Sequence, residues 1–81
     1  MTANIELLGY QKQVAGVSLV EFPLNDTTTV FDAFNHIAEL YPKLHLDPER
    51  VLYNINGELS KADTVLHSGD MIRFLPTMGG G

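Results

Sequence analysis

The chain has 81 residues, a length that supports one domain with one hydrophobic core. Its net charge is −5 and its 5 lysines and arginines are scattered, which excludes the clustered basic surface that nucleic-acid binding requires. It contains no cysteine, which excludes disulfides, thiolate nucleophiles and zinc–thiolate sites, and no apolar run approaches the ~20 residues of a membrane span.

The first part of the chain predicts a pair of strands. The elements expected are a strand over 5–10, a polar connection over 11–16 that ends in glycine, and a second strand over 17–24. Because the connection is short, the two strands should form a hairpin. Pro23 has no N–H group to donate to a neighbour, so the second strand is expected at an edge of the sheet.

An amphipathic helix follows. Thr29 and Asp32 have the spacing of a capping box, with aspartate in place of the usual glutamate. The apolar residues that share one helical face are Val30, Phe34, Ile37 and Tyr41. Pro42 should end the helix at about Tyr41, because the residue before proline avoids the helical conformation.

The second half of the chain predicts short strands joined by turns. The segments expected are a loop over 43–49, a strand over 50–56, a two-residue turn at Asn56-Gly57, a short returning strand over 58–60, a single helical turn over 63–66, a turn over 68–70 and a last strand over 71–76. The strand order around one helix predicts an α+β fold of the β-grasp type. We expect a mixed sheet of four to five strands with one main helix packed on one face, and the strands that flank the helix paired in parallel through a right-handed crossover.

The side chains offer no catalytic constellation. His36, His45 and His67 are single and widely spaced, whereas metal ligands normally come clustered, so no metal site is expected. His36 lies beside the apolar helix face, where we expect a surface or half-buried residue. Carboxylates such as Asp32 and Asp70 are better explained by capping and turns.

The chain ends in Thr77-Met78-Gly79-Gly80-Gly81. We therefore divide it into a domain over 1–76 and a flexible tail over 77–81. Glycines without Cβ add nothing to a core, and ordering each costs about 1–2 kcal/mol of backbone entropy. Such a tail is poor as structure but suits a probe that must enter a narrow channel. The alternative is a frayed terminus without function.

Several features together resemble one family. They are the strand-strand-helix opening, Asn56-Gly57-Glu58, Ser68-Gly69-Asp70 before the last strand, and the ending from Phe74-Leu75-Pro76 to Gly81. The combination resembles the ThiS/MoaD group of ubiquitin-like sulfur carriers, and within it the small subunit of molybdopterin synthase is most similar. The first strand departs from that subunit, which usually has an aromatic-rich strand followed by an Arg-Glu pair, and only Pro76 precedes the tail where two prolines are common.

The resemblance implies a chemistry for the tail. A MoeB/ThiF-type adenylating enzyme would use ATP to activate the terminal carboxylate of Gly81, and sulfur would then replace the adenylate to give a thiocarboxylate. Gly80 and Gly79 would pass through the enzyme's channel. The protein would be a carrier and a substrate of that enzyme, with no cofactor of its own. A large synthase subunit, or another sulfur acceptor enzyme, would be the next partner.

The resemblance also implies a docking surface. Leu59 and Leu75 match the places at which the small synthase subunit presents apolar residues to its partners, and Leu75 should lie on the open face of the sheet beside the tail. Arg73, Pro76 and Met78 complete the expected partner surface. The alternative for Leu59 is an ordinary core position.

Other functions remain open from the sequence. Molybdopterin biosynthesis is the favoured pathway, and a carrier for thiamine or another sulfur-containing metabolite is the alternative. A protein modifier ligated to lysines, or a non-catalytic interaction module, is the alternative of another class. Residues 1–4 lack the basic and apolar regions of a signal peptide, so we expect a cytoplasmic protein with neither nucleic-acid nor membrane partners.

Overall fold

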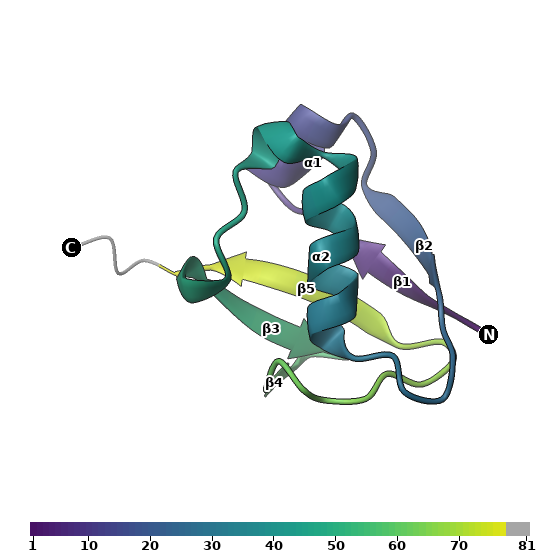
Figure 1. Ribbon diagram of the computed structural model, residues 1–81. Coiled ribbons are helices and arrows are strands. Elements are labelled where there is room, and N and C mark those ends of the chain that lie inside the picture. Colours follow the sequence, from purple (N-terminus) through teal and green to yellow (C-terminus); the bar gives the residue numbers. More distant parts are fainter. Residues whose placement is uncertain (78–81) are drawn as a thin grey trace.

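The computed structural model describes residues 1–77 and shows one mixed sheet crossed on one face by a helix (Figure 1). The elements in chain order are β1 (Thr2–Glu6), α1 (Tyr10–Ala15), β2 (Leu19–Pro23), α2 (Val30–Leu40), the 3₁₀ turns η1 (Pro42–Leu44) and η2 (Pro48–Arg50), β3 (Val51–Ile55), β4 (Glu58–Ser60) and β5 (Met71–Pro76). The 5 strands lie in the order β2-β1-β5-β3-β4. This arrangement is the β-grasp, so the predicted fold class is confirmed.

The parallel pair of the sheet is not the one that the sequence predicts. β1 and β5 pair in parallel at the centre, with Ile5 opposite Ile72, and every other pair is antiparallel. The expectation that the strands flanking α2 pair with each other is wrong. Ile5 and Ile72 are fully buried and belong under the helix, whereas β2 contains Pro23 and takes an edge, as predicted.

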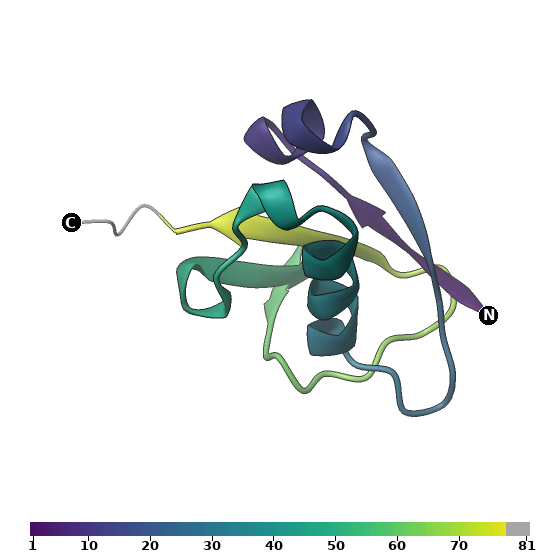
Figure 2. The ribbon, with the colours of Figure 1, turned by 45° about the horizontal axis from the view of Figure 1, so that its top comes forward.

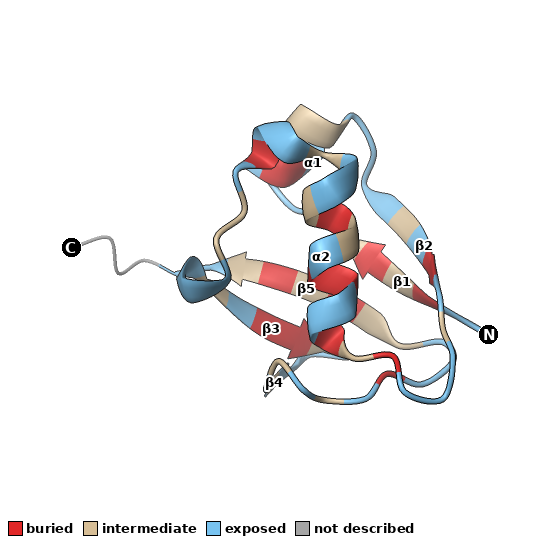
Figure 3. Cartoon of the chain, in the orientation of Figure 1, coloured by how far each residue is buried: buried red, intermediate tan, exposed pale blue. Residues whose placement is uncertain are grey.

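Helix α2 begins and packs as its sequence indicates. Thr29 Oγ1 accepts a hydrogen bond from the Asp32 N–H at 3.2 Å, and Asp32 Oδ2 accepts one from the Thr29 N–H at 2.9 Å, which completes the capping box. The helix buries Val30, Ala33, Phe34 and Ile37 against the sheet (Figure 3). The Phe34 ring meets the rings of Tyr53 and Phe74 edge-on, at centroid distances of 5.8 and 5.4 Å.

The connection between β1 and β2 is a short helix rather than the polar link predicted over 11–16. The first strand also ends at Glu6, before the predicted limit at residue 10. Gly9 and Gly16 flank α1 with φ values of 51° and 79°, which favour glycine. α1 lies beside η1 in both ribbon views (Figures 1 and 2). Its buried Gln11 donates through Nε2 to the Phe74 carbonyl at 2.9 Å, a contact across the sequence that no local pattern predicts.

Two further predicted segments differ. The loop expected over 43–49 contains η1 and the start of η2, and Leu44 is buried. The helical turn expected over 63–66 is absent from this segment, in which Ala62 and Asp63 form a turn closed by the Thr64 N–H on the Lys61 carbonyl at 3.1 Å and Val65 forms an antiparallel bridge with Thr29. Its carbonyls accept from the free N–H groups of the first turn of α2, with Thr64 O at 2.9 Å from Val30 N. Tertiary pairing with the helix start therefore outweighs the local helical preference.

Both predicted turns around β4 and β5 are confirmed. Asn56 and Gly57 have φ values of 55° and 90°, as a tight hairpin between β3 and β4 requires. Asp70, at the end of the 68–70 turn, accepts through Oδ1 from Asn56 Nδ2 at 2.9 Å, and Asn56 Oδ1 accepts from Met71 N at 2.9 Å. The two turns thus fix each other and the start of β5.

Candidate functional site

The predicted reacting residues Gly79, Gly80 and Gly81, together with Met78, lie outside the described residues. What the structure describes is the base from which the tail leaves, here called the tail root and defined as Pro76 and Thr77. Pro76 lies opposite Val51 in the ladder between β5 and β3. Thr77 donates to the Arg50 carbonyl twice, through its N–H at 3.0 Å and through Oγ1 at 3.3 Å.

Two contacts therefore fix the end of β5 and the tail root. Arg50 holds it from the turn before β3, and Gln11 of α1 binds the backbone of Phe74 three residues before Thr77. The Gln11 contact joins β5 to α1, and the Arg50 contact joins Thr77, just after β5, to the end of η2. The position and direction of the chain are thus defined up to residue 77.

The last strand presents its two faces to different surroundings. Ile72 and Phe74 are fully buried against α2, whereas Arg73 and Leu75 alternate with them and face the open side of the sheet. Leu75 lies opposite Leu52 of β3, which is 44% exposed. Leu59 of β4 is 66% exposed on the same face, where it lies opposite Asn54. We call Leu52, Leu59 and Leu75 the leucine patch.

The leucine patch bears on two sequence predictions. The expected positions of Leu59 and Leu75 on the open face are confirmed, and the alternative that Leu59 is a core residue is wrong. Leu52 was missed, because only the register with β5 brings it beside Leu75. An apolar group on an open sheet face is the kind of surface that binds another protein.

Arg73 lies on the same face as the leucine patch but is engaged within the chain. Its guanidinium forms an ion pair with Glu6 of β1, and the two side chains are 32% and 33% exposed. β5 places Arg73 between Glu6 and Asn54. Arg73, which is predicted on the partner surface, is thus half-buried. The Glu6 carboxylate would compete with any partner for its guanidinium.

A concave apolar site lies on the other side of the tail root. It has a volume of about 300 Å³ and is lined by Leu8, Gly9, Tyr10, Gln11, Leu44, Leu46, Val51 and Pro76. We call it the root pocket. The sequence does not reveal it, because its walls come from four segments that only the folded chain brings together. Predicted partner residue Pro76 thus faces this pocket as well as the tail.

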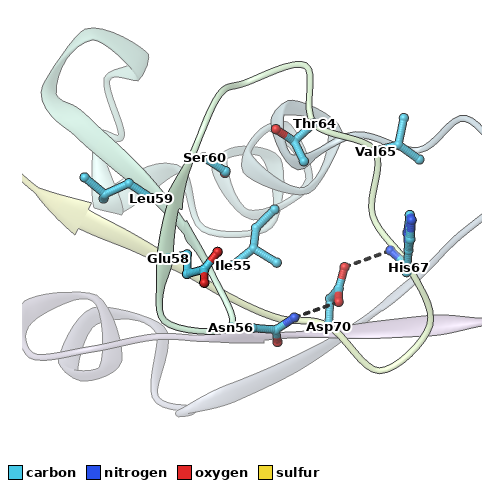
Figure 4. Close-up of a pocket in the computed structure, with 9 residues that line it drawn as sticks. All are labelled: Ile55, Asn56, Glu58, Leu59, Ser60, Thr64, Val65, His67 and Asp70. Carbon is cyan, nitrogen blue, oxygen red and sulfur yellow. Dashed lines mark hydrogen bonds between the residues drawn. The ribbon is translucent and has the colours of Figure 1, made fainter.

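A second hollow lies at the β4 edge of the sheet, between β4 and the 61–70 segment (Figure 4). It has a volume of about 650 Å³, and its polar wall includes Asn56 and Asp70, which bind each other. Asp70 also accepts through Oδ2 from the His67 N–H at 2.8 Å. These polar groups are thus used to hold turns, although the buried Ser60 hydroxyl has no partner in the described chain.

The titratable groups of residues 1–77 form no reactive centre. No three histidine, aspartate or glutamate side chains of this part of the chain gather as metal ligands would. His36 is half-buried against the Phe22 ring at a centroid distance of 4.9 Å, as expected from its place on the helix. Burial raises the pKa of the Tyr53 hydroxyl, whose ring packs in the core against Phe34 and Phe74.

The helices of residues 1–77 are all too short or too polar to cross a bilayer.

Comparison with known proteins gives a family match that spans nearly the whole chain. A family model described as the ThiS family matches residues 5–81. No curated protein matches the sequence.

Solved structures share the fold. Small archaeal modifier protein 1 from Haloferax volcanii has a TM-score of 0.81 at 21% identity, with 100% of both chains covered. Urm1 from Trypanosoma brucei has a TM-score of 0.69 at 18% identity, with 99% of this chain and 95% of that chain covered. A chain in the complex of subunits 1 and 2 of molybdopterin-converting factor from Helicobacter pylori has a TM-score of 0.64 at 21% identity, with 100% of both chains covered.

Proposed function

Because this chain belongs to the ThiS family, a family of ubiquitin-like sulfur carriers and modifiers, we propose that it is a sulfur carrier that reacts through the terminal carboxylate of Gly81. The observation that carries the proposal is that the family match runs through the tail to Gly81 rather than stopping at the folded domain. The domain over 1–76 then serves as a handle for partner enzymes, and residues 77–81 as the reacting arm.

The proposed reaction has two steps. A carboxylate oxygen of Gly81 attacks the α-phosphorus of ATP on a MoeB/ThiF-type adenylating enzyme, and pyrophosphate leaves. Hydrosulfide delivered by a sulfur donor then attacks the acyl carbon, the bond from that carbon to the phosphate oxygen breaks, and AMP leaves, which gives the thiocarboxylate and a proton. A carboxylate needs this activation because its oxygen is otherwise a poor leaving group. The absence of cysteine from the chain is compatible with this step, in which the sulfur would sit on the Gly81 carbonyl carbon.

Two features of the described residues support this role. The tail root is pinned by Arg50 and Gln11, so the arm starts from a defined point on a rigid sheet. The leucine patch lies on the open face of the sheet beside the tail root, where a tail-binding enzyme would approach. We propose Leu59, Leu75 and Arg73 as partner-binding residues there, with Pro76 and Met78 at the start of the arm.

We propose the cytoplasm as its location and molybdopterin biosynthesis as its pathway, with a large synthase subunit as sulfur acceptor. The pathway rests on resemblance to the small synthase subunit in the segment from β3 to the tail. Thiamine or another sulfur-containing metabolite is the alternative product. Reconstitution with a large molybdopterin synthase subunit and, in parallel, with the thiazole-forming enzyme of thiamine synthesis would separate them by which acceptor consumes the thiocarboxylate.

The function is tested by intact-mass analysis. Incubation with ATP, the cognate adenylating enzyme and a sulfur donor should exchange one oxygen for sulfur, and fragmentation should place that change at Gly81. A variant that lacks Gly80 and Gly81 is the control and should show no change. Sulfur on another residue would overturn the proposal. Ligation of Gly81 to a lysine without sulfur in the product would instead identify a protein modifier.

A further inference from the structure

The root pocket has the chemistry of a site for an apolar group. Its polar lining side chains are Gln11 and Tyr10, whose hydroxyl belongs to the exposed rim, and both ends of the Gln11 amide are occupied within the chain. Gln11 Nε2 donates to the Phe74 carbonyl at 2.9 Å, and Gln11 Oε1 accepts from the Leu8 N–H at 3.3 Å. Because these polar atoms are satisfied, the pocket offers a ligand mainly hydrocarbon surface.

The rim of the root pocket is exposed although it is apolar. Tyr10 is 61% exposed and Leu8 is 37% exposed, and both stand at the start of α1. The floor is more deeply buried, with Leu44 in the core and Leu46 and Val51 packed against it. An exposed aromatic beside a preformed apolar hollow is the arrangement found at the centres of protein interfaces, where an anchor side chain fills a pocket.

The position of the pocket indicates what fills it. Pro76 lines it, and the sequence continues for four residues beyond Thr77 to Gly81. Four residues span at most about 14 Å when fully extended. Any protein that holds the Gly81 carboxylate therefore lies within that distance of the tail root and must come close to the pocket mouth.

The alternation of side chains along β5 places apolar surface on both faces of the sheet at the tail root. Successive residues of β5 point to opposite faces of the sheet. Leu75 therefore belongs to the leucine patch on one face, and Pro76 lines the root pocket on the other. A partner that binds the tail thus meets apolar surface on both faces of the sheet at the tail root. The root pocket is concave, so it can take a projecting side chain at the tail root.

We propose that the root pocket receives one apolar side chain, of leucine, methionine or phenylalanine type, from the adenylating enzyme that binds the tail. This inference rests on the proposed function and identifies a second contact of the same partner. The enzyme grips the carrier from both faces of the sheet, with the tail between the two contacts. The root pocket contributes affinity for the carrier and does not touch the reacting carboxylate.

The test is the kinetics of ATP–pyrophosphate exchange with the purified adenylating enzyme and the full-length carrier. Tyr10→Ser and Leu8→Lys change the exposed rim, so folding should persist in both. We expect each to raise KM for the carrier about tenfold or more and to leave kcat within about twofold, because contacts remote from the reaction stabilise ground state and transition state equally. Val65→Ser is the matched control: Val65 is 42% exposed but lies beside the start of α2, away from the tail root.

The outcomes separate this inference from the proposed function. Unchanged KM in both rim variants, with normal exchange by the unaltered carrier, overturns the inference alone and is also the result expected for a small-molecule occupant. No exchange with the unaltered carrier overturns the proposed function and the inference with it. If the chain's own Met78 were the occupant, Met78→Ala and Leu8→Lys would each lower the melting temperature of the isolated carrier, which also overturns the inference.

Discussion

At the scale of single residues, the glycines of the tail and those of the domain have different reasons to be glycine. Gly57 and Gly69 have φ values of 90° and 85°, so their turns need a residue that accepts a left-handed backbone. Gly80 lies outside the described residues and beyond the end of the last strand at Pro76, and we predict no such demand there. The requirement at position 80 would then come from a partner.

Gly80→Val separates a tail that enters a channel from one that does not. Folding should not respond, because changes outside caps and core usually alter stability by no more than ~0.5 kcal/mol. Within a tight channel the β-branched side chain clashes, and adenylation should fall by orders of magnitude, since each ~1.4 kcal/mol of lost transition-state stabilisation costs tenfold. ATP–pyrophosphate exchange and a thermal melt measure the two effects. Unchanged exchange would show that no partner grips the tail at this residue.

At the scale of elements, β5 connects the core to both proposed contact surfaces. Ile72 and Phe74 join it to α2, and the Phe74 carbonyl joins it to α1 through Gln11. On the opposite face the strand carries Arg73, paired with Glu6, and Leu75, which lies beside Leu52. One strand therefore holds the domain together and carries the residues nearest the tail.

Leu75→Lys tests the leucine patch. Leu75 is only partly buried and faces away from α2, so the substitution should leave the melting temperature nearly unchanged while weakening binding to the adenylating enzyme. Calorimetric titration measures the affinity. Leu59→Lys, at a more exposed position of the same patch, should behave alike. A stability loss of the ~2–5 kcal/mol typical of truncated core leucines would instead assign Leu75 to the core.

At the scale of the whole molecule, the proposed function divides folding and reactivity along the chain. The core combines residues from β1, β2, α2, η1, β3 and β5, and the last main-chain contact recorded among residues 1–77 is Thr77 to Arg50. The net charge of −5 suits steering toward a basic partner surface. Under the proposed function, the domain would provide stability and recognition, and the tail would provide the reacting group.

Removing residues 78–81 tests this division. The shortened chain keeps every contact described above, so its free energy of unfolding should change by no more than ~0.5 kcal/mol. For a domain of this size, that corresponds to a change of about 2–4 °C in melting temperature. Sulfur transfer should be lost completely. The measurement is a thermal melt beside the intact-mass assay. A large drop in melting temperature would mean that the tail is part of the folded domain.

Features that depend on neighbours along the chain could be predicted from the sequence. The capping box of Thr29 and Asp32, the Asn56-Gly57 turn and the bounds of β5 are confirmed because short-range hydrogen bonds, φ preferences and alternation specify them. The open-face position of Leu75 follows from the same alternation. The family resemblance came from these local motifs.

Features that depend on contacts between distant residues could not be predicted from local patterns. α1 is held by the bond from Gln11 to Phe74, 63 residues away, and residues 63–66 form no helical turn because Val65 pairs with the start of α2. The parallel pairing of β1 with β5 reflects burial of both strands under the helix. Leu52 joins the leucine patch through register alone, and the root pocket exists only where four segments meet. Such arrangements minimise the free energy of the whole fold, which no local pattern encodes.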